Sequence, residues 1–128
     1  MSIQKTRSRI LLVEDNPVTM MSLSLFFKNS KYEVAQELAY AEEVSQQVKD
    51  LNPDILVMDI MLKGSMDGLG AAKEIREFSD IPILFVSALT DKVTLSKLTE
   101  VTNAGFIAKP YDYEQLEAKI DSLIKKNS

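Results

Sequence analysis

The chain has 128 residues, 45% of them hydrophobic, which is the size of one domain with a sizeable core. With 15 Lys and Arg against 19 Asp and Glu, the net charge is −4. This charge argues against nucleic-acid binding, because domains that bind nucleic acids usually carry a basic patch. Cys and His are both absent, which excludes disulfides, thiolate zinc sites and a histidine general base, so any chemistry must come from carboxylates, hydroxyls and lysines.

Five short segments are predicted strands. Four of them are almost continuously apolar, which is typical of parallel strands covered on both faces. The remaining segment alternates between apolar Tyr32 and Val34 and polar Glu33, so we expect it at an edge of the sheet. In chain order the predicted strands cover residues 10–13, 32–38, 55–58, 81–86 and 105–108.

A helical pattern follows each predicted strand. Asn16 and Pro17 are typical of an N-cap and a first helical position, and Val18, Met21 and Leu25 then recur at helical spacing. Asp67 and Asp112 precede later patterns and are candidate caps. The other apolar stripes are Val44, Val48 and Leu51; Leu69, Ala72 and Ile75; Val93 or Leu95, Leu98 and Val101; and Leu116, Ile120 and Leu123.

Strand and helix therefore alternate five times with short connections. Such alternation predicts parallel strands joined by right-handed crossovers, and hence an α/β three-layer sandwich. We expect residues 1–128 to form a single domain. No stretch approaches the ~18 apolar residues of a membrane span, and residues 1–10 lack the apolar core of a signal peptide, so we expect a cytoplasmic protein with no membrane partner.

Polar side chains follow four of the apolar runs. Glu14 and Asp15 follow the first, Asp59 the third, Ser87 the fourth and Lys109 the fifth. Each residue taken singly is more often a turn or cap residue. In an open α/β sheet, however, ligands bind outside the carboxyl ends of the strands. Together these residues predict a site at that edge.

The residue types favour phosphoryl chemistry with a magnesium ion. Glu14, Asp15 and Asp59 would repel one another unless positive charge lay among them, and Lys109 supplies part of that charge. A divalent cation would supply the rest, and oxygen ligands suit Mg²⁺. The Asp59 carboxylate, ionised at pH 7, can attack phosphorus without a general base, while Lys109 and Ser87 stabilise the phosphoryl oxygens. A phosphohistidine donor would have to be another molecule, because this chain has no His.

Five segments of the chain form a set that is highly specific, although each segment alone is weak. They are Ile10-Leu11-Leu12-Val13-Glu14-Asp15-Asn16, Val57-Met58-Asp59, Met66-Asp67-Gly68, Val86-Ser87-Ala88 and Lys109-Pro110. With these segments the sequence resembles the receiver domain of bacterial two-component response regulators, from about residue 8 to about residue 126. The resemblance implies a flavodoxin-like (βα)5 fold with strand order 2-1-3-4-5.

The resemblance also implies the role of each acidic site residue. Asp59 becomes the phosphoacceptor and a magnesium ligand. Glu14 and Asp15 become the acidic pair at the metal, one direct and the other through water. The backbone carbonyl of Met61 becomes a further ligand.

The remaining roles concern the phosphoryl group and the signal. Ser87 and Lys109 contact the phosphoryl group, and Phe106 occupies the aromatic switch position that responds together with Ser87. The partners would be a sensor histidine kinase or a histidine phosphotransfer protein as donor, and a downstream effector protein. The domain would catalyse its own phosphotransfer and a slow dephosphorylation without being an enzyme in the usual sense.

The sequence departs from the family pattern in three places. Nine positions lead from Asp59 to Gly68 with no proline between them, so we expect a longer loop. Phe106 stands where tyrosine is common, and an output that needs a tyrosine hydroxyl would be lost. Met61 and Leu89 are apolar where receivers often carry residues that orient water, so we expect a long-lived aspartyl phosphate.

Three other functions remain to be compared. A flavin-binding flavodoxin-like protein would hold its phosphate after the first strand, where Glu14 and Asp15 would repel it. An aspartyl phosphatase would need an Asp-x-Asp sequence after that strand, and a phosphate loop of the Gly-x-x-x-x-Gly-Lys type is absent. An interaction module without phosphorylation would not need the complete set of site residues.

Overall fold

The computed structural model describes residues 7–88 and 91–127. The predicted alternation of strands and helices is confirmed, with one short 3-10 helix, η1, added before the second α-helix. The elements in chain order are β1 (Arg9–Val13), α1 (Pro17–Lys28), β2 (Glu33–Leu38), η1 (Ala41–Glu43), α2 (Val44–Leu51), β3 (Ile55–Asp59), α3 (Gly68–Ile75), β4 (Ile83–Ser87), α4 (Lys92–Thr99), β5 (Ala104–Ala108) and α5 (Tyr113–Lys126).

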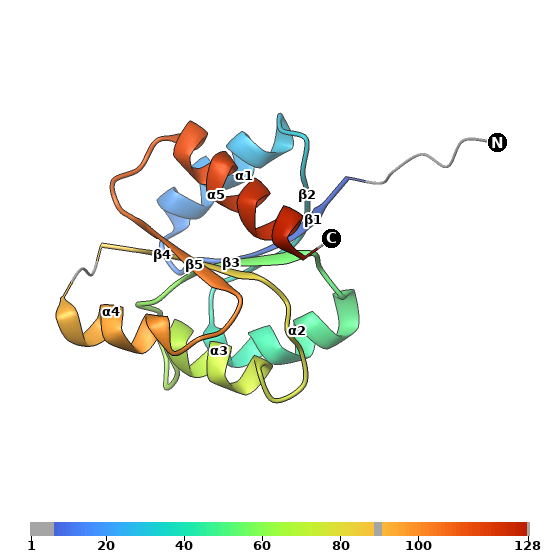
Figure 1. Cartoon of the computed structure of the whole chain (residues 1–128). Helices are drawn as coiled ribbons and strands as arrows, with labels where there is room; N and C mark the ends of the chain where they lie inside the picture. The colour runs from blue at the N-terminus through green and yellow to red at the C-terminus, as the bar shows by residue number, and fades with distance from the viewer. Residues whose placement is uncertain (1–6, 89–90, 128) are drawn as a thin grey trace.

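The strands form one five-stranded sheet in the order β2-β1-β3-β4-β5, and every pair is parallel. The expected three-layer α/β sandwich is confirmed: α1 and α5 cover one face of the sheet, and α2, α3 and α4 cover the other (Figure 1). The half-polar strand β2 lies at an edge, as its alternation predicts. Strand β4 begins at Ile83 rather than at the predicted Ile81, and Pro82 has no N–H to donate to a ladder.

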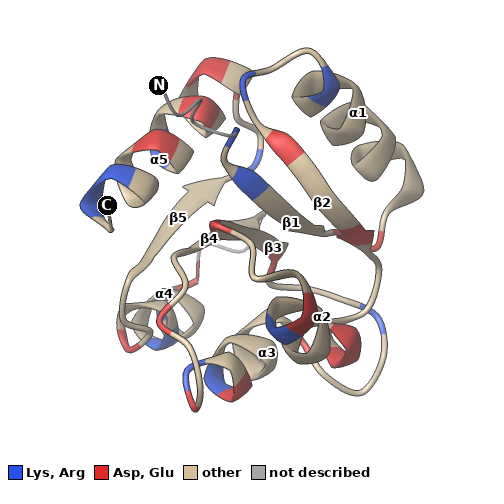
Figure 2. Cartoon of the chain, turned by 90° about the vertical axis from the view of Figure 1, so that its right-hand side faces the viewer, with Lys and Arg blue, Asp and Glu red and all other residues tan. Residues whose placement is uncertain are grey.

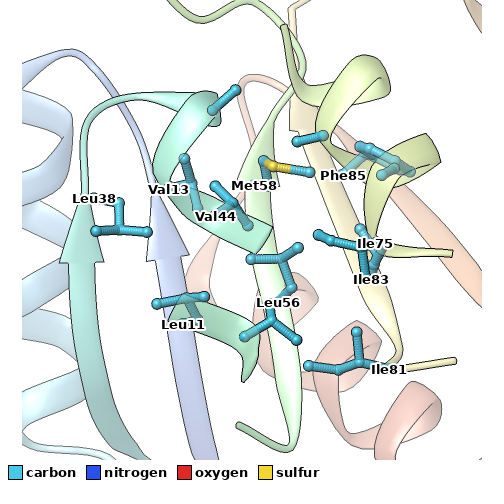
Figure 3. Close-up of a cluster of buried hydrophobic side chains, with 14 of the residues drawn as sticks. Leu11, Val13, Leu38, Val44, Leu56, Met58, Ile75, Ile81, Ile83 and Phe85 are labelled. Atoms are coloured by element: carbon cyan, nitrogen blue, oxygen red, sulfur yellow. The ribbon is translucent and has the colours of Figure 1, made fainter. Parts of the chain in front are cut away.

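Alternate residues of each central strand enter different hydrophobic clusters. Leu11, Leu56, Met58 and Phe85 point to the face covered by α2, α3 and α4, where Val44 and other apolar side chains meet them (Figure 3). Ile10, Leu12, Val57 and Leu84 point to the opposite face, toward α1 and α5. This two-sided burial explains why the strands are apolar at nearly every position.

Side chains preceding the helices cap them as the sequence predicts. Asn16 accepts hydrogen bonds from the backbone N–H groups of Val18 and Thr19 at 2.9 and 3.0 Å, and Pro17 occupies the first turn. Asp67 caps α3, and Asp112 forms a capping box with Gln115 at the start of α5. Each cap satisfies an amide that the helix itself leaves unpaired, which typically contributes about 1 kcal/mol.

The apolar stripe that identified α1 does not face the core. Val18, Met21 and Leu25 are 74%, 65% and 59% exposed, whereas Leu23 and Phe27 are buried against the sheet. The helix is apolar on most sides, so its periodicity fits more than one face. The sequence thus predicts the helix correctly and leaves its buried face undetermined.

Charged residues of both signs are spread over the surface, and α1 carries charge only at its C-terminal end, at Lys28 (Figure 2). No helix in the described part of the chain combines the length and the apolar character required to cross a membrane.

Candidate phosphoacceptor site

The predicted site residues lie at the carboxyl ends of four adjacent strands. Glu14 directly follows β1, Asp59 ends β3, Ser87 ends β4 and Lys109 directly follows β5. The parallel register brings these ends together, with Asp59 opposite Val86 of β4. Side chains that are far apart in the sequence therefore share one edge of the sheet.

Lys109 connects the two buried carboxylates. Its Nζ lies 2.7 Å from Oδ2 of Asp59 and 3.2 Å from Oε1 of Glu14. Its backbone N–H donates to the carbonyl of Ser87 at 3.0 Å, which fixes the strand end that carries it. The Lys109–Pro110 peptide bond is cis. Two carboxylates that the sequence predicts for the site therefore share one ammonium group.

Burial and charge oppose each other at this cluster. Burial raises the pKa of Glu14 above its ordinary value, although a hydrogen bond from the Asn16 amide and the charge of Lys109 both act to lower it. Burial also disfavours the charge on Lys109, but Asp59 and Glu14 outweigh this effect and raise the pKa of Lys109. Lys109 therefore stays protonated at neutral pH and compensates two carboxylates at once.

Asp59 combines burial with two defined contacts. It is only 7% exposed. Its Oδ1 accepts a hydrogen bond from the Met61 amide at 3.1 Å, and its Oδ2 faces Lys109. The carboxylate is therefore held in one orientation at the end of its strand, as an attacking nucleophile requires. The Met61 side chain itself is exposed.

Asp15 differs from its neighbour Glu14. It is partly exposed, and its Oδ2 accepts a hydrogen bond from the backbone N–H of Lys63 at 2.9 Å. Among residues 7–88 and 91–127, no three acidic side chains lie close enough together to form a ready-made metal site. The oxygen donors expected for magnesium are nevertheless present at this edge, and their chemistry fits the ion.

The loop between β3 and α3 closes tightly at its base. The Gly68 amide donates to the carbonyl of Ile60 at 2.8 Å, and a Cβ at Gly68 would lie 2.3 Å from the backbone oxygen of Asp59. A side chain at this position would push against the end of strand β3. The Met-Asp-Gly segment therefore ends in glycine because the backbone approaches Asp59 closely.

The predicted switch residues differ in their surroundings. Ser87 is fully buried at the end of β4. Phe106 of β5 is partly buried against the cluster on the face covered by α2, α3 and α4. Leu89, which the sequence singled out beside Ser87, lies outside the described residues.

The sequence did not single out Glu42, which contacts the loop that leads from Asp59 to α3. Its Oε1 accepts a hydrogen bond from the Met66 amide at 2.9 Å. The two residues are 24 positions apart. No local motif joins them, so only the folded chain shows this contact.

Comparison with known families decides the identity of the domain. The family model described as "Response regulator receiver domain" matches residues 10–121. The chain belongs to this family. It is therefore a receiver domain of two-component response regulators, whose general function is to accept a phosphoryl group.

Individual relatives agree with this assignment. The "Transcriptional regulatory protein BaeR" of Escherichia coli is 31% identical over 97% of this chain and 51% of its own length. The receiver domain of a modulated diguanylate cyclase from Desulfovibrio desulfuricans has a TM-score of 0.83 at 29% identity, covering 92% of this chain and 94% of that one. The Vibrio cholerae chemotaxis protein CheY4 shares the fold with a TM-score of 0.81 at 21% identity, covering 91% and 98%. The receiver chain spans about half the length of the curated relatives it matches.

Proposed function

We propose that Asp59 is the phosphoacceptor of this receiver, and that it takes the phosphoryl group from a phosphohistidine on a sensor histidine kinase or a histidine phosphotransfer protein. The observation that carries the proposal is the position of the Asp59 carboxylate, buried at a strand end and 2.7 Å from Lys109. Residues 1–128 act as one receiver domain in this proposal.

The transfer needs no proton acceptor on this chain. One Oδ atom of Asp59 forms a bond to phosphorus while the phosphorus–nitrogen bond of the donor breaks, and the electron pair stays on the donor imidazole. Lys109 passes from the free carboxylate to a phosphoryl oxygen, and the Ser87 hydroxyl contacts another. The developing charge is thereby stabilised by groups already at the strand ends.

Glu14, Asp15, Asp59 and the backbone carbonyl of Met61 are the proposed holders of Mg²⁺. When bound, the ion neutralises the crowded acids and the phosphoryl oxygens. The support is chemical, because all of these donors are oxygen atoms on the edge that Lys109 already occupies.

The acceptor assignment is tested by incubating the protein with a small acyl phosphate and Mg²⁺ and weighing it by mass spectrometry. Wild type should gain one phosphoryl group, and Asp59→Asn should gain none because the amide is not a nucleophile. Asp50→Asn, which removes an exposed acid on α2, is the matched control and should behave as wild type. Uptake by Asp59→Asn at the wild-type rate would refute the assignment. Turnover of the donor without build-up would indicate a phosphatase, and no uptake by wild type an inert module.

We further propose that the aspartyl phosphate is long-lived, because the apolar side chains of Met61 and Leu89 cannot orient an attacking water. Wild type loaded with phosphate and freed of donor should lose it slowly in Mg²⁺. The double variant Met61→Asn with Leu89→Glu should lose it several-fold faster, since a positioned polar group assists proton transfer. Equal decay rates in the two proteins would show that these side chains do not control the water.

The proposed signal leaves through Ser87 and Phe106 toward a downstream effector protein. The support is that Ser87 ends the buried strand next to Asp59, and that Phe106 lies on the neighbouring strand β5. Because Phe106 has no hydroxyl, its part in the proposed signal is a change in packing.

A further inference from the structure

The loop between β3 and α3 contains a segment that is held from outside the loop at both ends. We call this segment, residues 63–66, the strap. Gly64 within it has φ +108°, a left-handed backbone conformation that favours glycine. The strap is therefore bent at Gly64 and presents backbone amides on either side of the bend.

The first anchor of the strap is Asp15. The Lys63 amide donates to Oδ2 of Asp15 at 2.9 Å, across 48 positions of sequence. A hydrogen bond from an amide to a carboxylate is stronger than one between neutral groups. Asp15, which is one of the proposed magnesium ligands, is thus engaged with the strap.

The second anchor is Glu42, in η1 before α2. Its Oε1 accepts a hydrogen bond from the Met66 amide at 2.9 Å. A Cβ at Gly64 would lie 3.0 and 3.1 Å from the two carboxylate oxygens of Glu42, so this carboxylate also packs against the bend. Glu42 is not among the expected metal donors.

The acids at the strand ends contact different partners. Glu14 and Asp59 both contact Lys109, whereas Asp15 contacts the strap. A metal that draws in Asp15 has to compete with the Lys63 amide for the same carboxylate. The Lys63 amide and the metal are then alternative partners of the Asp15 carboxylate.

We propose that the strap competes with Mg²⁺ for Asp15, and that Glu42 is a positioning residue that sets the strength of this competition. The inference rests on the proposed magnesium site. Loss of the Glu42 anchor loosens the strap, releases Asp15 and tightens metal binding. By linkage, bound metal weakens the contact between Glu42 and the Met66 amide by the same factor.

The first test is the Kd of Mg²⁺, measured by titration calorimetry on the unphosphorylated chain. Glu42→Ala should bind Mg²⁺ more tightly than wild type by roughly fivefold, at the low end of measured coupling between sites. Glu42→Gln keeps an oxygen that accepts the Met66 amide and should stay close to wild type. Glu43→Ala removes the same charge from the neighbouring exposed residue and should also stay close to wild type. Affinity of Glu42→Ala that equals or falls below that of Glu42→Gln would overturn the proposal.

The second test follows the amide protons of Lys63 and Met66 by NMR as Mg²⁺ is added to wild type. Exchange of the Lys63 amide with water should accelerate because its acceptor is drawn away, and exchange of the Met66 amide should accelerate by up to the factor by which Glu42→Ala tightens Mg²⁺ binding. If Mg²⁺ binds and Lys63 keeps its protection, the strap proposal fails and the magnesium site stands. If wild type shows no Mg²⁺ binding at all, both proposals fail.

Discussion

At the scale of single residues, the site is arranged around an excess of negative charge. Glu14 and Asp59 are both buried, and Lys109 contacts both. One ammonium cannot fully compensate two carboxylates that have lost their water, which is why the pKa of Glu14 is raised and not lowered. The metal-free site is therefore held at a cost in folding stability.

This cost predicts a pH dependence of stability. The pKa of Glu14 is higher in the folded chain than in the unfolded chain, mainly because of burial. At a pH between these two pKa values, the folded chain therefore binds more protons than the unfolded chain. Stability contributed by this group is fully present below the ordinary pKa and is lost as the pH rises through the raised one. In urea unfolding without Mg²⁺, wild type should therefore lose stability relative to Glu14→Gln between about pH 4.5 and neutrality. A constant difference between the two proteins across this range would contradict the prediction.

At the scale of elements, the helices differ in how firmly they are held. Helix α4 has eight residues, and Leu98 is the one that is buried. Its sequence includes Val93, Thr94 and Thr99, which are β-branched and lose rotamer freedom in a helix, at up to ~0.7 kcal/mol each relative to alanine. Helix α5 has 14 residues, a capping box and three buried side chains.

We therefore predict that α4 opens most easily. Amide hydrogen exchange of the metal-free chain should be faster in α4 than in α5 by about tenfold or more, because few buried contacts oppose local opening. The amide of Leu98 is an internal control. It should exchange more slowly than the other amides of α4, because Leu98 is the buried residue of this helix. Equal protection in α4 and α5 would show that packing outweighs helix propensity here.

The sequence predicts the elements well because each carries its own local signal. Apolar runs mark the strands, and Asn16, Asp67 and Asp112 mark helix starts through side-chain caps that need no distant partner. The buried face of α1 could not be predicted in this way. The helix has apolar residues on more than one side, and only the position of the sheet decides that Leu23 and Phe27 are covered.

The site can likewise be predicted from the sequence in part. Glu14, Asp59 and Lys109 can be predicted to meet, because parallel strands bring their carboxyl ends to one edge. The contact of Asp15 with the Lys63 amide cannot be predicted, since it depends on the path of a loop without a local signal. The contact of Glu42 with the Met66 amide cannot be predicted either, because Glu42 lies in η1, between β2 and α2.

At the scale of the whole molecule, magnesium should act as a ligand that stabilises the fold. A ligand that binds only the folded chain raises the free energy of unfolding according to its concentration relative to Kd. At 100 times Kd we expect about 2.7 kcal/mol, measured as a shift of the urea midpoint. Sodium chloride at equal ionic strength is the control. An equal shift with sodium chloride would indicate screening of the acidic surface instead of a specific site.

The order of the strands also has a consequence for synthesis on the ribosome. The chain emerges from its N-terminus, so β1 appears first, yet in the sheet it lies between β2 and β3. Glu14 and Asp59 are both translated well before Lys109, which follows the last strand. A nascent chain that has completed β4 holds the acids without the cation that compensates them. The proposed site is therefore complete only when nearly the whole domain has left the exit tunnel.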